Sequence, residues 1–166
     1  DMRAAEEPYQ RSQELGFGNA NMLVGYADFA ANVRRFDEGR QAAARARELD
    51  PLNANVLRSS GYLEFSARAF DAAVPLMRVA LSLNARTNVA NATLGDIALL
   101  RGDAAQAKVW YEKESSPLSR LRGLATVTMR LGDAAGAERF RSELVARFGT
   151  NSYYQQAQIF AQWQRL

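Results

Sequence analysis

Apolar and small residues recur along the chain at the spacing of amphipathic helices. Residues 20–32 place such side chains at positions i, i+3, i+4 and i+7, which predicts one helix. These side chains are Leu23, Tyr26, Ala27 and Ala30. Residues 36–48 repeat the spacing and predict a second helix, which Pro51 prevents from continuing. The two helices and the turn between them therefore form a closed unit, residues 20–53.

The same unit recurs with a fixed period. Gly61 and Gly95 lie 34 residues apart, and so do Phe36 and Phe70. A constant period of this length is typical of a stacked array of helical repeats. We therefore expect residues 1–166 to form a single all-α array of antiparallel helix pairs.

The third repeat is shorter than the others. A Gly-Asp turn at Gly102 recurs at Gly132, only 30 residues later, so four residues are missing between them. The segment 115–117, Ser-Ser-Pro, marks the loss and should end the preceding helix early. The expected boundaries are 1–19 for the second helix of a repeat, 20–53, 54–87, 88–117 and 118–151 for whole repeats, and 152–166 for the first helix of a repeat.

The sequence lacks the residue types on which many catalytic mechanisms depend. The 166 residues include neither Cys nor His, which excludes disulfides, thiol nucleophiles, imidazole bases and nearly all transition-metal sites. The paired positions Asp28 and Asp96 lie two repeats apart, too far for joint acid–base work in a stacked array. We therefore expect no enzymatic activity, no cofactor and no metal.

Charge and hydropathy limit the partners and the compartment. The net charge of +3 is too small to favour a nucleic acid or a membrane surface. No apolar run reaches the roughly 18 residues of a membrane-spanning helix. A chain without Cys suits the cytoplasm, which we expect, or the periplasm. Heavy use of Ala, Arg and Gly is typical of a GC-rich bacterial genome.

The repeat resembles the tetratricopeptide repeat family. The shared pattern is Leu-x-x-Leu/Tyr-Gly/Ala in the first helix, two small residues seven positions apart in the second helix, and a closing Pro. The matching residues are Leu23, Tyr26, Ala27, Gly39, Ala46 and Pro51, then Leu57, Gly61, Ala73 and Ala80, then Leu94, Gly95 and Ala107. Glu64, Asn91 and Glu114 depart from the pattern, which affects the local packing expected there. The resemblance implies a right-handed superhelical solenoid.

The resemblance also implies that first helices line a concave groove, where extended peptides or partner helices bind. The second, fifth, ninth and twelfth positions of each repeat would face it. From these positions we expect partner contacts by Asn21, Asp28, Asn55, Arg58, Tyr62, Phe65, Asp96, Arg122 and Met129. Guanidinium groups, an aromatic pair and amides suit a peptide with acidic and apolar side chains. Since few interface residues dominate binding, each position has solvated polar surface as its alternative reading.

The leading hypothesis is a non-catalytic interaction scaffold for a protein or peptide, within a larger bacterial signalling or regulatory protein. Residues 154–163, YQQAQIFAQW, resemble C-terminal repeat regions of bacterial proteins that carry a winged-helix or nucleotidyl-cyclase-like domain. One alternative is therefore an intramolecular sensory arm of such a protein. RNA binding by the helical repeat is a third hypothesis, which the small net charge disfavours. Self-association through the apolar faces of residues 1–15 and 152–166 is a further alternative.

Overall fold

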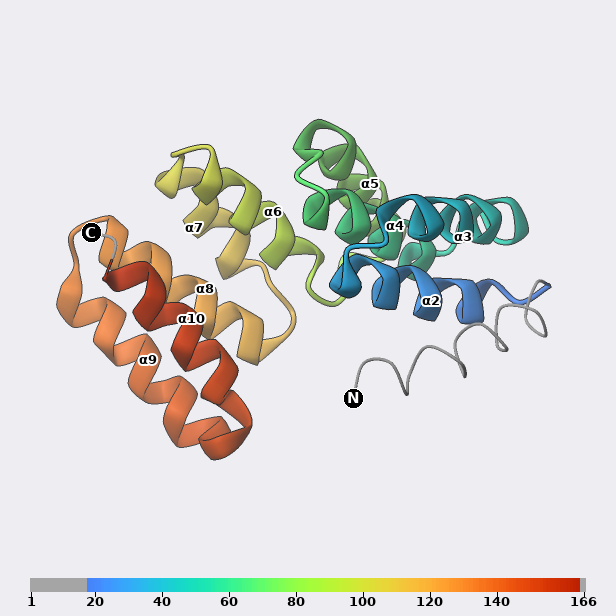
Figure 1. The fold of residues 1–166 in the computed structure, drawn as a ribbon. Coiled ribbons are helices and arrows are strands. Elements are labelled where there is room, and N and C mark those ends of the chain that lie inside the picture. Colours follow the sequence, from blue (N-terminus) through green and yellow to red (C-terminus); the bar gives the residue numbers. More distant parts are fainter. Residues whose placement is uncertain (1–17, 165–166) are drawn as a thin grey trace. The chain divides into compact units, whose positions relative to one another are not determined.

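The computed structural model describes residues 18–164, and each regular element within that range is a helix (Figure 1). The helix expected within residues 1–19 lies outside the described residues, apart from Gly18 and Asn19, which precede the first described helix. The chain forms two compact units, divided between Thr87 and Asn88. The architecture is an all-α helical repeat.

The first unit, called unit 1, contains two helix pairs. They are α2 (Ala20–Val33) with α3 (Phe36–Leu49), and α4 (Ala54–Ser66) with α5 (Phe70–Leu83). The side chains of Asn19 and Asn53, one repeat apart, cap α2 and α4 by accepting backbone N–H groups at 3.0 and 2.9 Å. These caps occupy corresponding positions and define the starts of α2 and α4.

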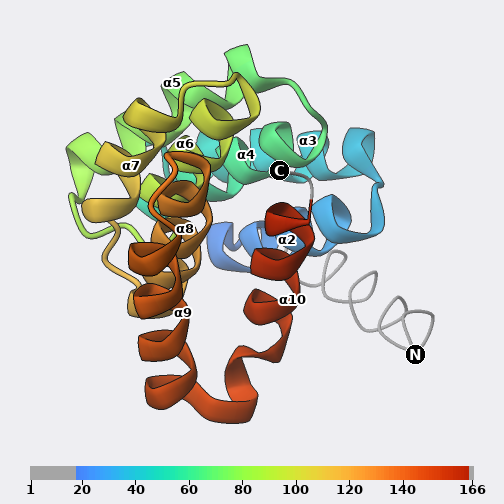
Figure 2. The ribbon, with the colours of Figure 1, turned by 90° about the vertical axis from the view of Figure 1, so that its left-hand side faces the viewer.

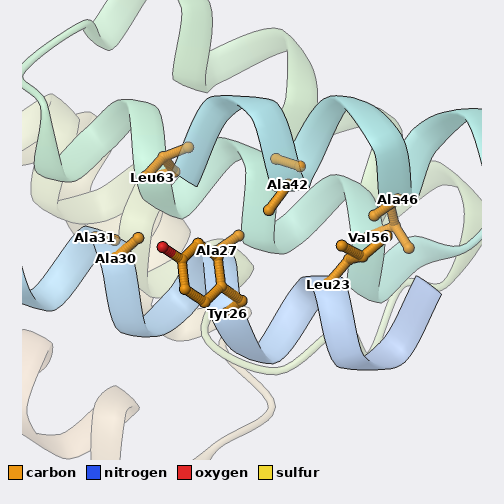
Figure 3. Close-up of a cluster of buried hydrophobic side chains, with 10 residues drawn as sticks. Leu23, Tyr26, Ala27, Ala30, Ala31, Ala42, Ala46, Val56 and Leu63 are labelled. Carbon is orange, nitrogen blue, oxygen red and sulfur yellow. The ribbon is translucent and has the colours of Figure 1, made fainter. Parts of the chain in front are cut away.

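Small side chains allow the helices of unit 1 to approach closely (Figure 3). Ala27 and Ala30 of α2 are fully buried, as is Ala46 of α3. A Cβ atom on Gly39 would lie 2.7 Å from Leu63 Cδ1. Glycine costs a helix interior about 1 kcal/mol relative to alanine, and here the close approach of α4 requires it.

The second unit, called unit 2, contains the remaining elements. They are α6 (Ala90–Leu100), α7 (Ala104–Glu112), α8 (Pro117–Arg130), α9 (Ala134–Phe148), a 3-10 turn η1 (Gly149–Ser152) and α10 (Tyr153–Trp163). As the Ser-Ser-Pro segment predicts, α7 is short, and Pro117 is the first residue of α8.

The last helix, α10, packs against α8 in the way that the first helix of a further repeat would. It runs antiparallel to α9, from the turn that joins the two helices (Figure 2). Ile159 is fully buried, and Trp163 Nε1 donates a hydrogen bond to the backbone oxygen of Ala125 at 3.2 Å. Tyr154, which the apolar pattern assigns to the same helix, is 71% exposed. The packed face of α10 is therefore narrower than the sequence pattern indicates.

The turns inside the four helix pairs share one backbone conformation. Arg34 and Arg68 adopt left-handed φ angles of 64° and 63°, and Gly102 and Gly132 adopt 85° and 88° at the corresponding places. Glycine enters this region without the steric penalty that a Cβ atom carries. The turns of unit 2 therefore have glycine at the position with positive φ, whereas the turns of unit 1 have arginine there and carry the steric penalty of its Cβ atom.

The start of α6 departs from the repeat. Val89, directly before the helix, has a left-handed φ of 56°. Its apolar side chain cannot accept a hydrogen bond from the first N–H groups of α6, so the residue at the cap position provides no side-chain cap. The carboxylate of Glu114, only 2% exposed, accepts the N–H groups of Val89 and Ala92 at 3.1 and 2.8 Å. It also accepts the N–H of Ser116 at 2.8 Å. Glu114, which departs from the tetratricopeptide pattern, thus replaces the missing cap.

Tyr111 of α7 fills the space between α6 and α8, the first helices of two successive repeats in unit 2. Its side chain is fully buried. A Cβ atom on Gly95 of α6 would lie 2.6 Å from the Tyr111 ring, and one on Gly123 of α8 would overlap the same ring. Both glycines are therefore needed for the ring to fit.

We expect Gly123→Ala to destabilise the protein by about 1–3 kcal/mol, because the added methyl group would overlap a ring with no free space around it. Gly25→Ala is the matched control, since a Cβ there meets nothing within 4 Å. That control should stabilise α2 by up to about 1 kcal/mol. Urea unfolding followed by circular dichroism measures both, and equal effects of the two substitutions would contradict the packing of Tyr111.

We expect Glu114→Gln to destabilise unit 2 by about 2 kcal/mol, because an amide has one acceptor oxygen and would turn its NH2 group toward a backbone N–H. Glu112→Gln, at an exposed position of α7, is the control and should change little. Thermal unfolding of the two variants decides the matter. A Glu114→Gln protein as stable as the Glu112→Gln protein would show that the carboxylate is not needed as a cap.

Candidate partner-binding face

In each unit, the first helices of successive repeats lie side by side and form a face, here called the first-helix face of that unit. It consists of α2 and α4 in unit 1, and of α6, α8 and α10 in unit 2. In unit 1 an ion pair joins the two helices. Arg58 Nη2 lies 2.8 Å from Asp28 Oδ2, and Arg58 Nη1 lies 3.4 Å from Asp28 Oδ1. The hydroxyl of Ser59 donates to Asp28 Oδ1 at 2.7 Å. The Arg58 side chain is only 17% exposed, so the pair is partly shielded from water.

Unit 2 repeats this arrangement at the corresponding positions. Both Nη atoms of Arg122, in α8, lie 2.9 Å from the two carboxylate oxygens of Asp96, in α6. The Tyr111 hydroxyl supplies the third hydrogen bond, to Asp96 Oδ1 at 2.6 Å. A bidentate pair of this kind fixes direction as well as distance. In both units, therefore, a carboxylate on one first helix holds the guanidinium of the next.

The surroundings keep these groups in defined protonation states. Burial, and then the negative charge of Asp96, raise the pKa of Tyr111 well above its usual value of 10.0. Burial acts to lower the pKa of Arg122, but the charge and hydrogen bonds of Asp96 outweigh it, so that pKa is raised. Tyr111 therefore stays a hydrogen-bond donor and Arg122 stays a cation.

Apart from Glu64, which pairs with Arg40 of α3, the rest of the unit 1 face is uncharged. Asn21 and Asn55 are exposed. Tyr62 donates a hydrogen bond to Asn32 Oδ1 at 3.2 Å, and the Tyr62 ring centroid lies 6.3 Å from that of Phe65. These side chains come from two neighbouring helices and gather amide and aromatic surface on one face.

The structure brings some of the expected contact residues together and leaves others apart. It pairs Asp28 with Arg58, Asp96 with Arg122, and Tyr62 with Phe65. Met129 is half-buried near the end of α8. Whether these residues contact a partner stays a prediction.

Sequence reasoning missed the third partner of each ion pair, Ser59 and Tyr111. It also missed the pairs, although a signal existed. In each case an Asp at the ninth position of a repeat precedes an Arg at the fifth position of the next repeat. The spacing is 30 residues in unit 1 and 26 in unit 2, and the four missing residues of the third repeat account for the difference.

Neither a metal-binding group of acidic residues nor a membrane-spanning helix is found among the described residues. Within residues 18–164 no group of three or more acidic side chains could hold a metal ion. The same range contains no helix with the length and apolar character needed to cross a bilayer.

The fold is found in several solved structures. A crystal structure of MamA matches with a TM-score of 0.66 and 17% identity, over 95% of this chain and 92% of that chain. Pseudomonas aeruginosa PilF matches with a TM-score of 0.66 and 18% identity, over 94% and 73%. PilW, a type IV pilus biogenesis factor, matches with a TM-score of 0.51 and 14% identity, over 95% and 90%.

MamA, PilF and PilW are tetratricopeptide-repeat proteins, so this chain has the fold that the sequence pattern predicts. No protein-family model and no curated protein matches the sequence. At these identities the likeness concerns the fold.

We expect the stability of the protein to fall as the pH rises through 10 to 12. Burial, and then the hydrogen bond to Glu38, raise the pKa of Tyr26 to about 12 from 10.0. A raised pKa means that the folded protein binds the phenol proton more tightly, so its contribution is complete below pH 10 and is lost up to pH 12. The raised pKa of Tyr111 acts in the same direction.

Free energies of unfolding in urea, measured at several alkaline pH values, test this dependence. Wild-type protein should lose stability more steeply than a Tyr26→Phe variant across this range. The same slope in both proteins would show that the Tyr26 phenol is not held in its neutral form.

Proposed function

We propose that the chain is a non-catalytic scaffold that holds a segment of a partner protein on its first-helix face. Three proteins with this fold are tetratricopeptide-repeat proteins, whose members commonly act as interaction scaffolds. One of them, PilW, is described as a type IV pilus biogenesis factor. The absence of Cys and His from the sequence supports recognition over catalysis.

The observation that carries the proposal is the surface of unit 1. Two adjacent helices, α2 and α4, present exposed amide groups from Asn21 and Asn55 beside the half-buried rings of Tyr62 and Phe65. Aromatic rings supply contact area, and amides supply both donors and acceptors for a peptide backbone. Such a surface is suited to a protein segment.

The setting of the scaffold rests on the sequence alone. The resemblance of residues 154–163 to repeat regions of bacterial signalling proteins supports a place in a larger bacterial regulatory protein. Without thiols, the chain suits either the cytoplasm, which we favour, or the periplasm.

A pulldown from bacterial lysate with a charge-matched pair of variants tests the proposal. Asn55→Arg places a long cation on the first-helix face, whereas Gln41→Arg places the same cation on an exposed position of α3. A partner that uses the face should be retained by wild-type and Gln41→Arg protein, and about tenfold less by Asn55→Arg protein.

Circular dichroism of the three proteins serves as the folding control. Equal retention by both variants would contradict the assignment of the face. Retention lost equally in both would point to a general charge effect and would contradict it as well.

A further inference from the structure

We propose that the first-helix face of unit 1 selects an extended, uncharged segment of its partner, because the protein's own side chains already neutralise every charge on the two helices of that face. The inference rests on the proposed function, and it names the class of ligand that this surface takes. An uncharged segment takes the place of the peptide with acidic side chains that the guanidinium groups of Arg58 and Arg122 suggest when the sequence is considered alone.

The charges of the two helices can be followed one by one. The sequence of α2 contains a single charged residue, Asp28, and that of α4 contains two, Arg58 and Glu64. Asp28 and Arg58 pair with each other. Glu64 pairs with Arg40 of α3, whose Nε and Nη2 atoms lie 2.9 Å from its two carboxylate oxygens. All three charges are therefore compensated inside unit 1.

The Asp28 carboxylate occupies the place that an acidic ligand would need. It receives hydrogen bonds from both terminal nitrogens of Arg58 and from the Ser59 hydroxyl. A ligand carboxylate could take the two Nη contacts of Arg58 only by displacing Asp28, which would leave a partly buried carboxylate without its cation. At the other N–H groups of Arg58 it would meet a cation whose charge Asp28 already offsets. Asp28 thus acts as a built-in acidic ligand and blocks acidic ligands from outside.

The side chains of the unit 1 face that remain available to a ligand are uncharged. Asn21 and Asn55 stand one repeat apart and expose amide groups that can pair with the N–H and C=O groups of an extended backbone. Phe65, half-buried between the rings of Tyr62 and Phe70 at 6.3 and 6.1 Å, adds a surface for an apolar or aromatic side chain. Binding to such a surface should depend weakly on salt, because the charges of α2 and α4 are already paired within unit 1.

Selection from a phage-displayed library of random dodecapeptides on the wild-type chain tests the inference directly. Binders that Asn55→Arg weakens but Gln41→Arg does not are scored for composition. We expect this pool to contain no more Asp and Glu than the unselected library, and to bind with affinities that change less than about twofold between low and high salt.

The outcomes separate the inference from the proposed function. A face-dependent pool enriched in Asp and Glu would overturn the neutral selection and leave the scaffold function standing. A selection without any face-dependent binder would overturn the scaffold function, and the inference with it.

A second selection uses Asp28→Ala, which releases Arg58, beside Asp37→Ala as the control. Asp37 is 95% exposed on α3, so its removal changes the net charge equally without touching the Asp28–Arg58 pair. We expect acidic peptides to be enriched about tenfold on Asp28→Ala and not on Asp37→Ala. No enrichment on a folded Asp28→Ala protein would contradict the blocking role of Asp28. If that variant fails to fold, the wild-type pool still decides.

Discussion

A carboxylate on one first helix that holds the guanidinium of the next is the interaction on which the surface of this protein depends. It occurs in both units, between Asp28 and Arg58 and between Asp96 and Arg122. In each case a hydroxyl group completes the set of three donors to the carboxylate. A partly buried ion pair is a modest source of stability, because desolvation offsets much of its attraction. Its larger effects are to fix two helices relative to each other and to remove a free cation from the face.

Tyr111 takes part both in the packing between helices and in the ion pair of unit 2. Its ring needs the two glycines that α6 and α8 place against it, Gly95 and Gly123, and its hydroxyl binds Asp96. Small residues at helix contacts are thus linked to the polar contacts on the surface. In unit 1 the third donor is Ser59, within α4 itself, and the helices pack through a cluster in which alanines lie beside Leu23, Tyr26 and Leu63. The two units reach the same ion pair with different supports.

The sequence predicts the fold well because its information is local and periodic. The 34-residue spacing, the Asn caps and the Gly-Asp turns determine where helices begin and end. The departures from the family pattern were harder to interpret. Glu64 and Glu114 replace small or apolar residues, and each is explained only by a partner distant in sequence: the Arg40 side chain for one, and the start of α6 for the other. A periodic pattern does not report such pairings.

The candidate face shows the same limit. Position within the repeat locates the residues of the face, and whether they bind a partner stays a prediction. Position within the repeat does not predict whether these residues offer an uncompensated charge to a ligand, because that depends on which side chains form ion pairs between helices. Asp28 and Arg58 were each assigned to the face for their own chemistry, whereas in the structure they cancel. The repeated order of Asp at the ninth position and Arg at the fifth position of the next repeat would have been the signal.

The most direct test of this account is nitrogen-15 NMR of the arginine side chains in the folded protein. Guanidinium groups held by two hydrogen bonds rotate slowly about the Nε–Cζ bond and exchange their protons slowly with water. The account predicts resolved, slowly exchanging Nη signals for Arg58 and Arg122, which Asp28→Asn and Asp96→Asn respectively abolish. Rapidly averaging Nη signals for both arginines in the wild-type protein would contradict it, since the first-helix face would then carry free cations.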